Sequence, residues 1–372
     1  MNKNQRACAV VWSLAVISVV AAQQETVQGP GCRREECVPV AQCPILKERL
    51  LENPTEETFK EIRKLTCFVK NRRPSVCCPS PSPPPPPSRR RLATLKSKQS
   101  LLPTDCGKST YIPAFEGEEA PPNAYPWLAI LQYRVIEGGN LITNRVVCSG
   151  SVISERYVLI PAQCVHRNLT TDRGVTVEEV LLGDWDTSKD PDCTSNGRGR
   201  GVCAPPVQRF PIEEVIVHPE FNLRGILSDD VALIRLGRPI DFGRSGGFIQ
   251  PVCLPQPGET QEPMLSKGGI LTSWSFRSQR PHNHILTSVD KAACNKILRD
   301  VFVKEQICMQ VEEGEPDFIA TRGGPLMVSG PSRSTYTQVG ILSSKSSSSR
   351  VLPGLFTYIP PYMRWIEGSL EP

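Results

Sequence analysis

The chain has 372 residues, of which 39% are hydrophobic and 22% are charged. Its formal net charge of +5 falls to +3 once Lys3 and Arg6 leave with an N-terminal leader, a balance too weak to argue for nucleic-acid binding. The leader also carries Cys8, so 14 cysteines remain, and an even number in an oxidising compartment favours disulfides over metal sites. We therefore expect no metal and no cofactor.

Residues 1–22 are predicted to be a secretory signal peptide. Lys3 and Arg6 precede an apolar run from Ala7 to Val20, and the small residues Ala21 and Ala22 then provide a cleavage pattern. A membrane anchor is the alternative, but the run is shorter than the roughly 20 residues that a spanning helix needs. No other segment is long and apolar enough to span a membrane, so we expect a secreted protein.

Residues 31–79 are predicted to form a small disulfide-stabilised domain. Six cysteines lie within about 47 residues, too few to bury a self-sufficient core, so cross-links must supply most of the stability. Spacing alone allows about 15 pairings of six cysteines. Residues 45–51 and 58–65 have the apolar periodicity of two short helices. No acid/base constellation stands out, which favours recognition over catalysis.

Residues 80–105 are predicted to be an extended, exposed linker. A proline-rich run ending at Ser88 is followed by Arg89, Arg90 and Arg91, and such a stretch cannot pack a core. The arginines suit either polyanion binding or cleavage by a trypsin-like protease, and we favour cleavage.

Residues 106–372 contain many short β-runs separated by turn signals, which favours an all-β barrel or sandwich. Near the C-terminus, residues 361–368 are compatible with a helix that packs one apolar face on the strands. The main β-runs are Trp127 to Tyr133, Tyr157 to Ile160, Val175 to Leu182, Val215 to Val217, Val231 to Leu236, Gly269 to Trp274 and Gln338 to Leu342.

Six motifs in this region come in the order and approximate spacing of a trypsin-like serine protease domain. They are Pro126-Trp127, Cys148 to Ser154, Pro161 to Cys164, Asp230 to Leu236, Gly323 to Leu326 and Pro353 to Phe356. The adjacent pair Cys77-Cys78 and the spacing of the first six cysteines resemble the clip domain of arthropod secreted proteases. The chain thus resembles an arthropod clip-domain serine protease homologue. This implies a mainly β fold, a trypsin-like double six-stranded antiparallel β-barrel with a C-terminal helix, preceded by a small disulfide-knotted clip domain.

The resemblance also implies how the cysteines pair. Cys148 and Cys164 would bracket the loop that carries the family's catalytic histidine, and Cys106 would tie the linker to Cys253. The remaining pairs would be Cys32–Cys77, Cys37–Cys67 and Cys43–Cys78 in the clip domain, and Cys193–Cys203 and Cys294–Cys308 in the barrel domain. Every cysteine of the mature chain then has a partner.

The positions that match the family's catalytic triad are occupied by Gln163, Asp230 and Arg322. Triad catalysis needs a nucleophilic hydroxyl, an imidazole base and a carboxylate that orients the imidazole. The Gln163 amide does not take up a proton near neutral pH, and the Arg322 guanidinium offers only donors and forms no acyl-enzyme. The chain's four histidines, His166, His218, His282 and His284, do not fall at the base position. We therefore expect a pseudoprotease, with Asp230 as a structural residue.

Other positions of the family's site also lack the residues that activation and substrate binding need. Thr321 replaces the aspartate that pairs with a freed N-terminus, Ala320 replaces the oxyanion-loop glycine, and Pro113 stands where a basic residue should precede the activating cut. Phe318 replaces a cysteine whose partner, expected within the serine run from Ser343 to Ser349, is missing too. Lys345 stands where glycine would let a substrate side chain pass.

By resemblance, we expect a secreted, noncatalytic cofactor or regulator of a haemolymph protease cascade. Its expected partners are clip-domain serine proteases and prophenoloxidase, in melanisation and innate immunity. The alternative is an extracellular adhesion or developmental scaffold, and a protease with unusual residues is a third reading. Asn168 begins a glycosylation sequon, Asn168-Leu-Thr170, in a predicted loop.

Overall fold

The computed structural model divides the chain into two compact units, Met1–Ser88 and Arg89–Pro372, which we treat separately. It describes residues 37–40, 43, 46, 62, 64–70, 73–78, 100–109, 111–137, 140–142, 148–166, 175–194, 202–256, 265, 268–275, 277–298, 305–313, 318–330, 335–345 and 353–372. The expected signal peptide, the linker arginines Arg89, Arg90 and Arg91 and the sequon at Asn168 lie outside the described residues. Among the described residues, no helix is long and apolar enough to cross a membrane.

The first unit contains a three-stranded antiparallel sheet in the order β1-β3-β2. Leu46 and Ile62, one from each segment expected to be helical, are buried together with Cys43 and Val76, while most of those two segments lies outside the described residues. The strands are β1 (Cys37–Pro39), β2 (Thr66–Lys70) and β3 (Arg73–Cys77).

Disulfides cross-link this small unit. Cys37 is bonded to Cys67, and Cys43 is bonded to Cys78. Cys77 is also disulfide-bonded, and Cys32, its expected partner, lies outside the described residues. A unit of this size buries little apolar surface, so these bonds are expected to supply much of its stability.

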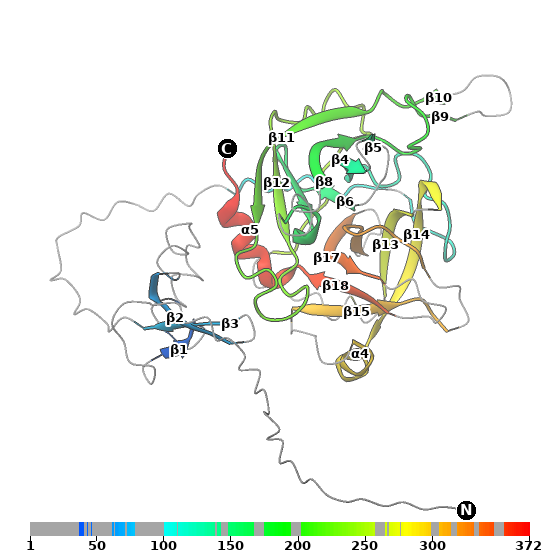
Figure 1. Cartoon of the computed structure of the whole chain (residues 1–372). Coiled ribbons are helices and arrows are strands. Elements are labelled where there is room, and N and C mark those ends of the chain that lie inside the picture. The colour runs from blue at the N-terminus through cyan, green and yellow to red at the C-terminus, as the bar shows by residue number, and fades with distance from the viewer. Residues whose placement is uncertain are drawn as a thin grey trace, which may run out of the picture. The chain divides into compact units, whose positions relative to one another are not determined.

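The second unit contains two closed antiparallel barrels of six strands each (Figure 1). In the first barrel the strand order is β4-β6-β7-β12-β11-β8, and β8 pairs with β4 to close the ring. A short strand, β5 (Asn140–Ile142), pairs with the end of β4 outside the ring. The six strands are β4 (Leu128–Glu137), β6 (Cys148–Val152), β7 (Tyr157–Ile160), β8 (Val175–Leu182), β11 (Gln208–Val217) and β12 (Ala232–Leu236).

The second barrel closes in the order β13-β14-β15-β18-β17-β16. Helix α4 (Lys291–Leu298) precedes β15, and the disulfide Cys294–Cys308 joins the helix to that strand. The strands are β13 (Gly269–Ser275), β14 (Ser278–Val289), β15 (Gln306–Gln310), β16 (Pro325–Ser329), β17 (Tyr336–Ser344) and β18 (Gly354–Tyr358).

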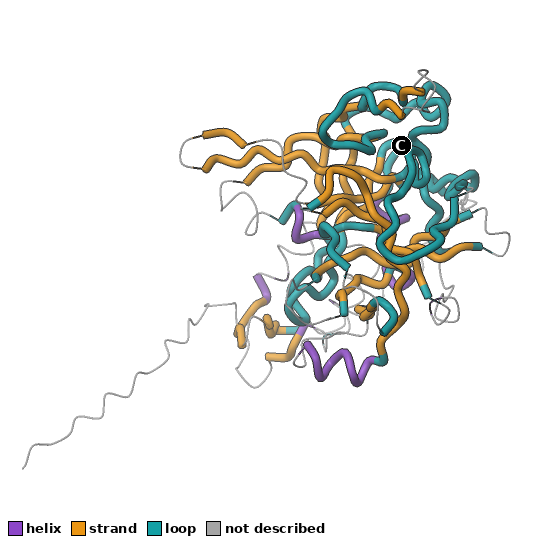
Figure 2. Tube along the Cα trace, turned by 90° about the vertical axis from the view of Figure 1, so that its right-hand side faces the viewer, coloured by secondary structure: helices purple, strands orange, loops and turns teal. Residues whose placement is uncertain are grey.

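The rest of the second unit is mostly loop, as Figure 2 shows, with helices limited to short segments. A two-stranded hairpin, β9 (Cys193–Thr194) and β10 (Val202–Cys203), is closed by the disulfide Cys193–Cys203. The chain ends in a short 3-10 turn and helix α5 (Met363–Ser369), whose Met363 and Ile366 are buried. The C-terminal helix and the double barrel predicted from the sequence are thus confirmed.

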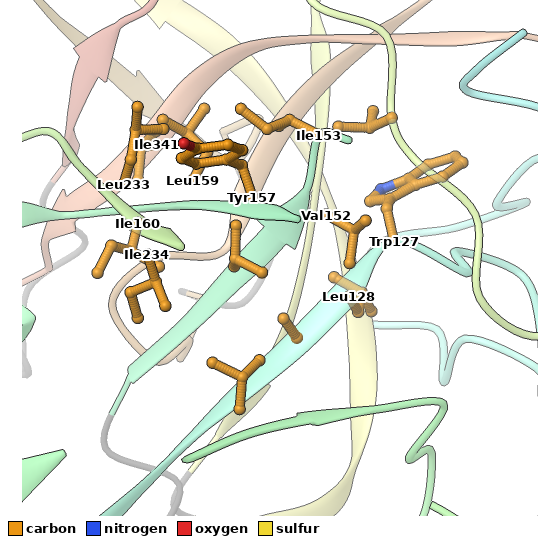
Figure 3. Close-up of a cluster of buried hydrophobic side chains, with 14 of the residues drawn as sticks. Trp127, Leu128, Val152, Ile153, Tyr157, Leu159, Ile160, Leu233, Ile234 and Ile341 are labelled. Atoms are coloured by element: carbon orange, nitrogen blue, oxygen red, sulfur yellow. The ribbon is translucent and has the colours of Figure 1, made fainter. Parts of the chain in front are cut away.

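A shared hydrophobic cluster joins the two barrels, and the second barrel also has a core cluster of its own. Trp127, Leu159 and Leu233 of the first barrel are fully buried in the same cluster as Met327 and Ile341 of the second (Figure 3). Trp127 also donates its indole N–H to the Met327 sulfur at 3.2 Å. This shared core fixes one barrel against the other, and the loops between the barrels therefore have a defined geometry.

Candidate functional site

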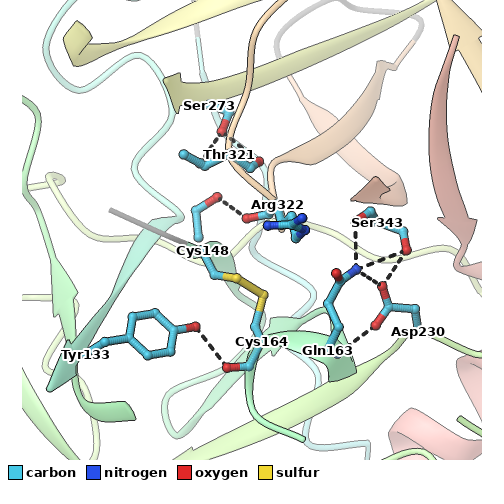
Figure 4. The surroundings of a disulfide bond; sticks show 10 residues. Tyr133, Cys148, Gln163, Cys164, Asp230, Ser273, Thr321, Arg322 and Ser343 are labelled. Carbon is cyan, nitrogen blue, oxygen red and sulfur yellow. Dashed lines mark hydrogen bonds between the residues drawn. A yellow bond between two sulfur atoms is a disulfide. The ribbon is translucent and has the colours of Figure 1, made fainter. Parts of the chain in front are cut away.

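Three separate elements bring Gln163, Asp230 and Arg322 together between the barrels (Figure 4). Gln163 lies in a single 3-10 turn, η3 (Ala162–Cys164), that follows β7. Asp230 lies two residues before β12, and Arg322 lies three residues before β16. The disulfide Cys148–Cys164 holds the η3 turn against the start of β6.

The Asp230 carboxylate is fully buried and surrounded by donors. The Gln163 backbone N–H donates to Oδ1 at 2.8 Å, and the Gln163 side-chain amide donates to Oδ2 at 2.5 Å. The Ser343 hydroxyl also donates to Oδ2, and the same Gln163 amide reaches the Ser343 carbonyl at 2.7 Å. Burial raises the pKa of Asp230 to about 6, although these hydrogen bonds favour its ionised form. The cluster therefore joins η3, β12 and β17.

Arg322 has a fixed backbone and an exposed side chain. Its carbonyl accepts hydrogen bonds from the Ser149 N–H at 2.8 Å and the Ser149 hydroxyl at 3.2 Å. The next residue, Gly323, has φ of +91°, and a Cβ there would lie 1.8 Å from the Ser149 carbonyl oxygen, so only glycine fits. Among the described residues, the Arg322 side chain has no hydrogen bond or ion pair.

Thr321, at the position of the family's N-terminus acceptor, is held by neutral groups. Its N–H donates to the Trp274 carbonyl at 2.8 Å, and its hydroxyl lies 2.8 Å from the Ser273 hydroxyl. A hydroxyl pair needs no cation, so the loop is ordered here without the ion pair that a freed amino terminus would supply.

The segment at the family's activation position is pinned by Glu116. This carboxylate accepts hydrogen bonds from His284 Nδ1 and from the Ile285 N–H, both at 2.5 Å, and the two side chains are only 6% and 7% exposed. Pro113 is itself buried, whereas Phe115 between the two is 62% exposed. No sequence pattern indicated this pairing, because Glu116 lies in a polar run and His284 is 168 residues away.

Phe318, which was expected to replace a family cysteine, is part of the core of the second barrel. It is 2% exposed, and a Cβ on Gly354 would lie 2.7 Å from its ring, so the ring packs directly on the Gly354 backbone. The His284 ring lies 5.4 Å from the Phe318 ring, and the Lys345 ammonium lies 4.9 Å from its centre. Glu116, His284, Phe318 and Lys345 thus form one continuous series of contacts.

The four histidines are all described, and none has a hydrogen bond to Asp230 within the described part of the chain. His166 packs its ring 5.2 Å from Phe221, and His282 lies near the Arg280 carbonyl. His218 packs against Tyr362 and Trp365, and burial lowers its pKa to about 4.

The loop that leads to Asp230 is supported by an ion network in which two buried carboxylates meet the partly exposed Arg224. Arg224 pairs with Asp229, and at 2.9 Å with Glu305, while the Tyr362 hydroxyl donates to Asp229 at 3.0 Å. Asp229 is 1% exposed and has a positive φ of 55°, an uncommon conformation that costs free energy and must be held by its surroundings. This network fixes the start of β12.

The comparisons with known proteins agree with this architecture. The sequence profile described as Trypsin matches residues 114–366, and the one described as Regulatory CLIP domain of proteinases matches residues 29–78. Phenoloxidase-activating factor 1 of Holotrichia diomphalia is 29% identical over 377 residues, which cover 98% of each chain. CLIP domain-containing serine protease B10 of Anopheles gambiae is 30% identical, over 96% of this chain and 97% of the relative. A solved structure of the Drosophila Grass clip serine protease of the Toll pathway matches with a TM-score of 0.59 and 27% identity, covering 89% of this chain and 93% of that one.

The chain therefore belongs to the trypsin family. More narrowly, it is an arthropod clip-domain serine protease-like protein, because both profiles and relatives that span nearly its whole length agree.

Proposed function

We propose that the protein is a noncatalytic clip-domain homologue that acts as a cofactor or regulator of an extracellular protease cascade. The observation that carries this proposal is the combination of Gln163 against the buried Asp230 and Arg322 at the nucleophile position. Acyl transfer needs a hydroxyl or thiol and a base that accepts its proton, and neither residue supplies one.

The rest of the site supports the same proposal. Removal of a triad leaves a protease some rate enhancement from its oxyanion hole and binding pocket. Here we propose that the buried Phe318 closes the pocket and that Ala320 replaces the oxyanion-loop glycine. The buried Pro113 further removes the basic residue after which an activating protease would cut.

The cascade is assigned through relatives. One relative is named phenoloxidase-activating factor 1, another from Drosophila melanogaster is named melanization protease 1, and Grass belongs to the Toll pathway. A role in an immune protease cascade follows for this chain, with clip-domain serine proteases and prophenoloxidase as proposed partners. Six disulfides suit an oxidising extracellular compartment, and we propose secretion into haemolymph.

The test is depletion of the protein from haemolymph, followed by a phenoloxidase assay. We expect the response to microbial challenge to change and to return when purified protein is added back. An unchanged response would reject the cascade role and favour the adhesion or developmental scaffold. Labelling of the purified protein by a serine-directed fluorophosphonate, abolished by one substitution in the barrel domain, would instead reject the noncatalytic assignment.

A further inference from the structure

Under the proposed function, Phe318 closes the pocket beside Arg322 to a partner's side chain. Phe318 is buried and packs on Gly354, as described above, and it belongs to the core cluster of the second barrel. Anything that binds at this place must therefore lie on the surface above Phe318. Lys345 lies over the Phe318 ring, and the exposed Arg322 follows Phe318 by four residues; we call these two cationic side chains the cationic ledge.

Arg322 is presented on a rigid base. Three consecutive residues tie its backbone to three strands: the Thr321 N–H donates to Trp274 of β13, the Arg322 carbonyl accepts from Ser149 of β6, and the Gly323 N–H donates to Leu342 of β17. A side chain on a fixed backbone loses little further backbone entropy on binding. Its planar fork of donors matches a carboxylate.

No described acidic group neutralises Arg322 by direct contact. The nearby Asp230 is buried, and Gln163 and Ser343 already donate to both of its oxygens. Figure 4 shows the Arg322 side chain on the Gln163 and Ser343 side of the site, without a bond to either. The charge thus remains available to an external anion.

Lys345 brings a second charge to the same edge. It follows Ser344, the last residue of β17, and Gly323 donates to Leu342 of that strand, so Arg322 and Lys345 flank one short paired stretch. The Phe318 ring beneath Lys345 gives its ammonium a cation–π contact at 4.9 Å. Phe318 therefore both closes the pocket and supports the ledge.

We propose that the cationic ledge is a docking site for an extended acidic segment of a partner protein. An extended chain with carboxylates at alternate positions presents them on one face, about 7 Å apart, which suits two cations placed along a strand end. The site is formed without cleavage, because Glu116 and Thr321 order it in the intact chain. The proposal rests on the noncatalytic function, since it assigns the former substrate surface to a partner that is not cut.

The test uses the full secreted chain and a fluorescent peptide in which glutamate alternates with serine, with its glutamine analogue as the probe control. We compare Arg322→Gln and Lys345→Gln with Arg244→Gln, which removes an arginine that is 90% exposed and paired with Asp241 elsewhere on the surface. Fluorescence anisotropy should show about a tenfold loss of affinity for Arg322→Gln and a smaller loss for Lys345→Gln. Arg244→Gln should remain within about twofold, and added salt should weaken binding in the parent protein.

Three results would overturn the proposal. One is equal binding of the glutamate and glutamine peptides, and another is parent-like binding by Arg322→Gln with a native circular dichroism spectrum. The third is a sulfated polysaccharide that displaces the peptide while all three variants lose affinity equally, which would indicate nonspecific attraction. None of these outcomes restores catalysis, and fluorophosphonate labelling tests that separately, so the two proposals fail independently.

Discussion

The Asp230 carboxylate is fully buried, and it accepts hydrogen bonds from the backbone and side-chain amides of Gln163 and from the Ser343 hydroxyl. In a triad a carboxylate orients an imidazole. Here Asp230 accepts from an amide, and the amide in turn donates to Ser343, so these residues form a hydrogen-bonded link between the two barrels. The role expected for Asp230 from the sequence, a structural one, remains a prediction that substitution can test.

Asp230→Asn should destabilise the protein, most strongly at acid pH. An asparagine places an NH₂ group among donors and leaves at least one hydrogen bond unmade, at a cost of about 1–3 kcal/mol. The folded pKa of about 6 exceeds the unfolded value near 4, so between these the folded state binds more protons and stability falls as pH rises. The Asp230→Asn variant has no carboxyl group to titrate at this position. The difference in unfolding free energy between the parent and the variant should therefore decrease by about 2–3 kcal/mol from pH 4 to pH 7. Urea denaturation across that range measures it, and a constant gap would show that Asp230 does not titrate as inferred.

Restoring two triad residues should not restore peptidase activity. In the double variant Gln163→His/Arg322→Ser, Phe318 remains packed on Gly354, and under the proposed function it keeps an arginyl substrate from placing its side chain. Hydrolysis of an arginyl p-nitroanilide should stay at the level of the Arg322→Ser single variant. A rate clearly above that level would mean that Phe318 does not block the pocket.

Among the elements, the segment from Tyr111 to Gly117 departs most from what the family motif predicts. It is not a loose strand waiting for a cut, because Glu116 is buried against His284 and Ile285, and the Tyr111 carbonyl accepts the Tyr336 hydroxyl at 2.6 Å. Both ends of the exposed Phe115 turn are thus fixed by buried contacts.

Glu116→Gln should loosen this segment without unfolding the barrels. One amide group would face donors that a carboxylate satisfies, and the Ile285 N–H or His284 would lose its partner. We expect faster chymotrypsin cleavage after Phe115 and faster hydrogen exchange around Phe318. Glu119→Gln is the matched control, because Glu119 lies two residues beyond this segment and forms only a partly exposed pair with Arg280. Equal cleavage of the two variants would show that Glu116 does not pin the segment.

The loop that precedes β12 offers a second test of an element. Arg224→Met keeps the apolar stem but leaves the buried Asp229 and Glu305 without their cation, which should lower the unfolding free energy by about 3 kcal/mol. Arg244→Met removes an exposed pair and should change it by about 0.5 kcal/mol or less. Urea unfolding of both variants measures the two changes. Equal decreases in unfolding free energy would show that the Arg224 network does not stabilise the fold more than an exposed ion pair does.

Sequence patterns predicted some elements well and others poorly. Residues 157–160 and 175–182 were expected as strands and are β7 and β8 with the same bounds, because apolar, β-branched residues mark them clearly. By contrast, β14 contains Arg280, Pro281 and His284 and was not expected as a strand. Its polar side chains find partners far along the chain, including Asp186 and Glu116, and such contacts leave no local periodicity. The Glu116–His284 pairing could not be predicted for the same reason, because its two residues lie far apart in the sequence. Gln163, Asp230 and Arg322 could be predicted because each lies in a recognisable motif.

At the level of the whole molecule, disulfides link residues within each unit and none of those described links one unit to the other. Cys106 and Cys253 are bonded, so the start of the second unit is tied to its own barrel. All other described cysteines beyond Cys106 pair within the same unit. Among the disulfides that the structure describes, none connects the two units, so the polypeptide backbone is the covalent connection between them.

Cleavage after Arg89, Arg90 or Arg91 should therefore release the clip domain even without a reductant. We expect two separate bands on a non-reducing gel after exposure to an active clip protease, and a new N-terminus just after one of these arginines. A variant with all three arginines changed to glutamine should resist. Fragments that separate only after reduction would place the cut beyond Cys106, where the bond to Cys253 keeps them together.

The Phe318 ring has a last consequence for how long the protein persists. Body fluids that contain trypsin-like enzymes also contain inhibitors that seize them, either by inserting a side chain into the specificity pocket or by trapping an acyl-enzyme. Under the proposed function, the Phe318 ring packed on the Gly354 backbone would deny the first route, and Arg322 would deny the second. We expect such inhibitors to silence the active enzymes around this protein while leaving it in circulation, so that its influence outlasts theirs.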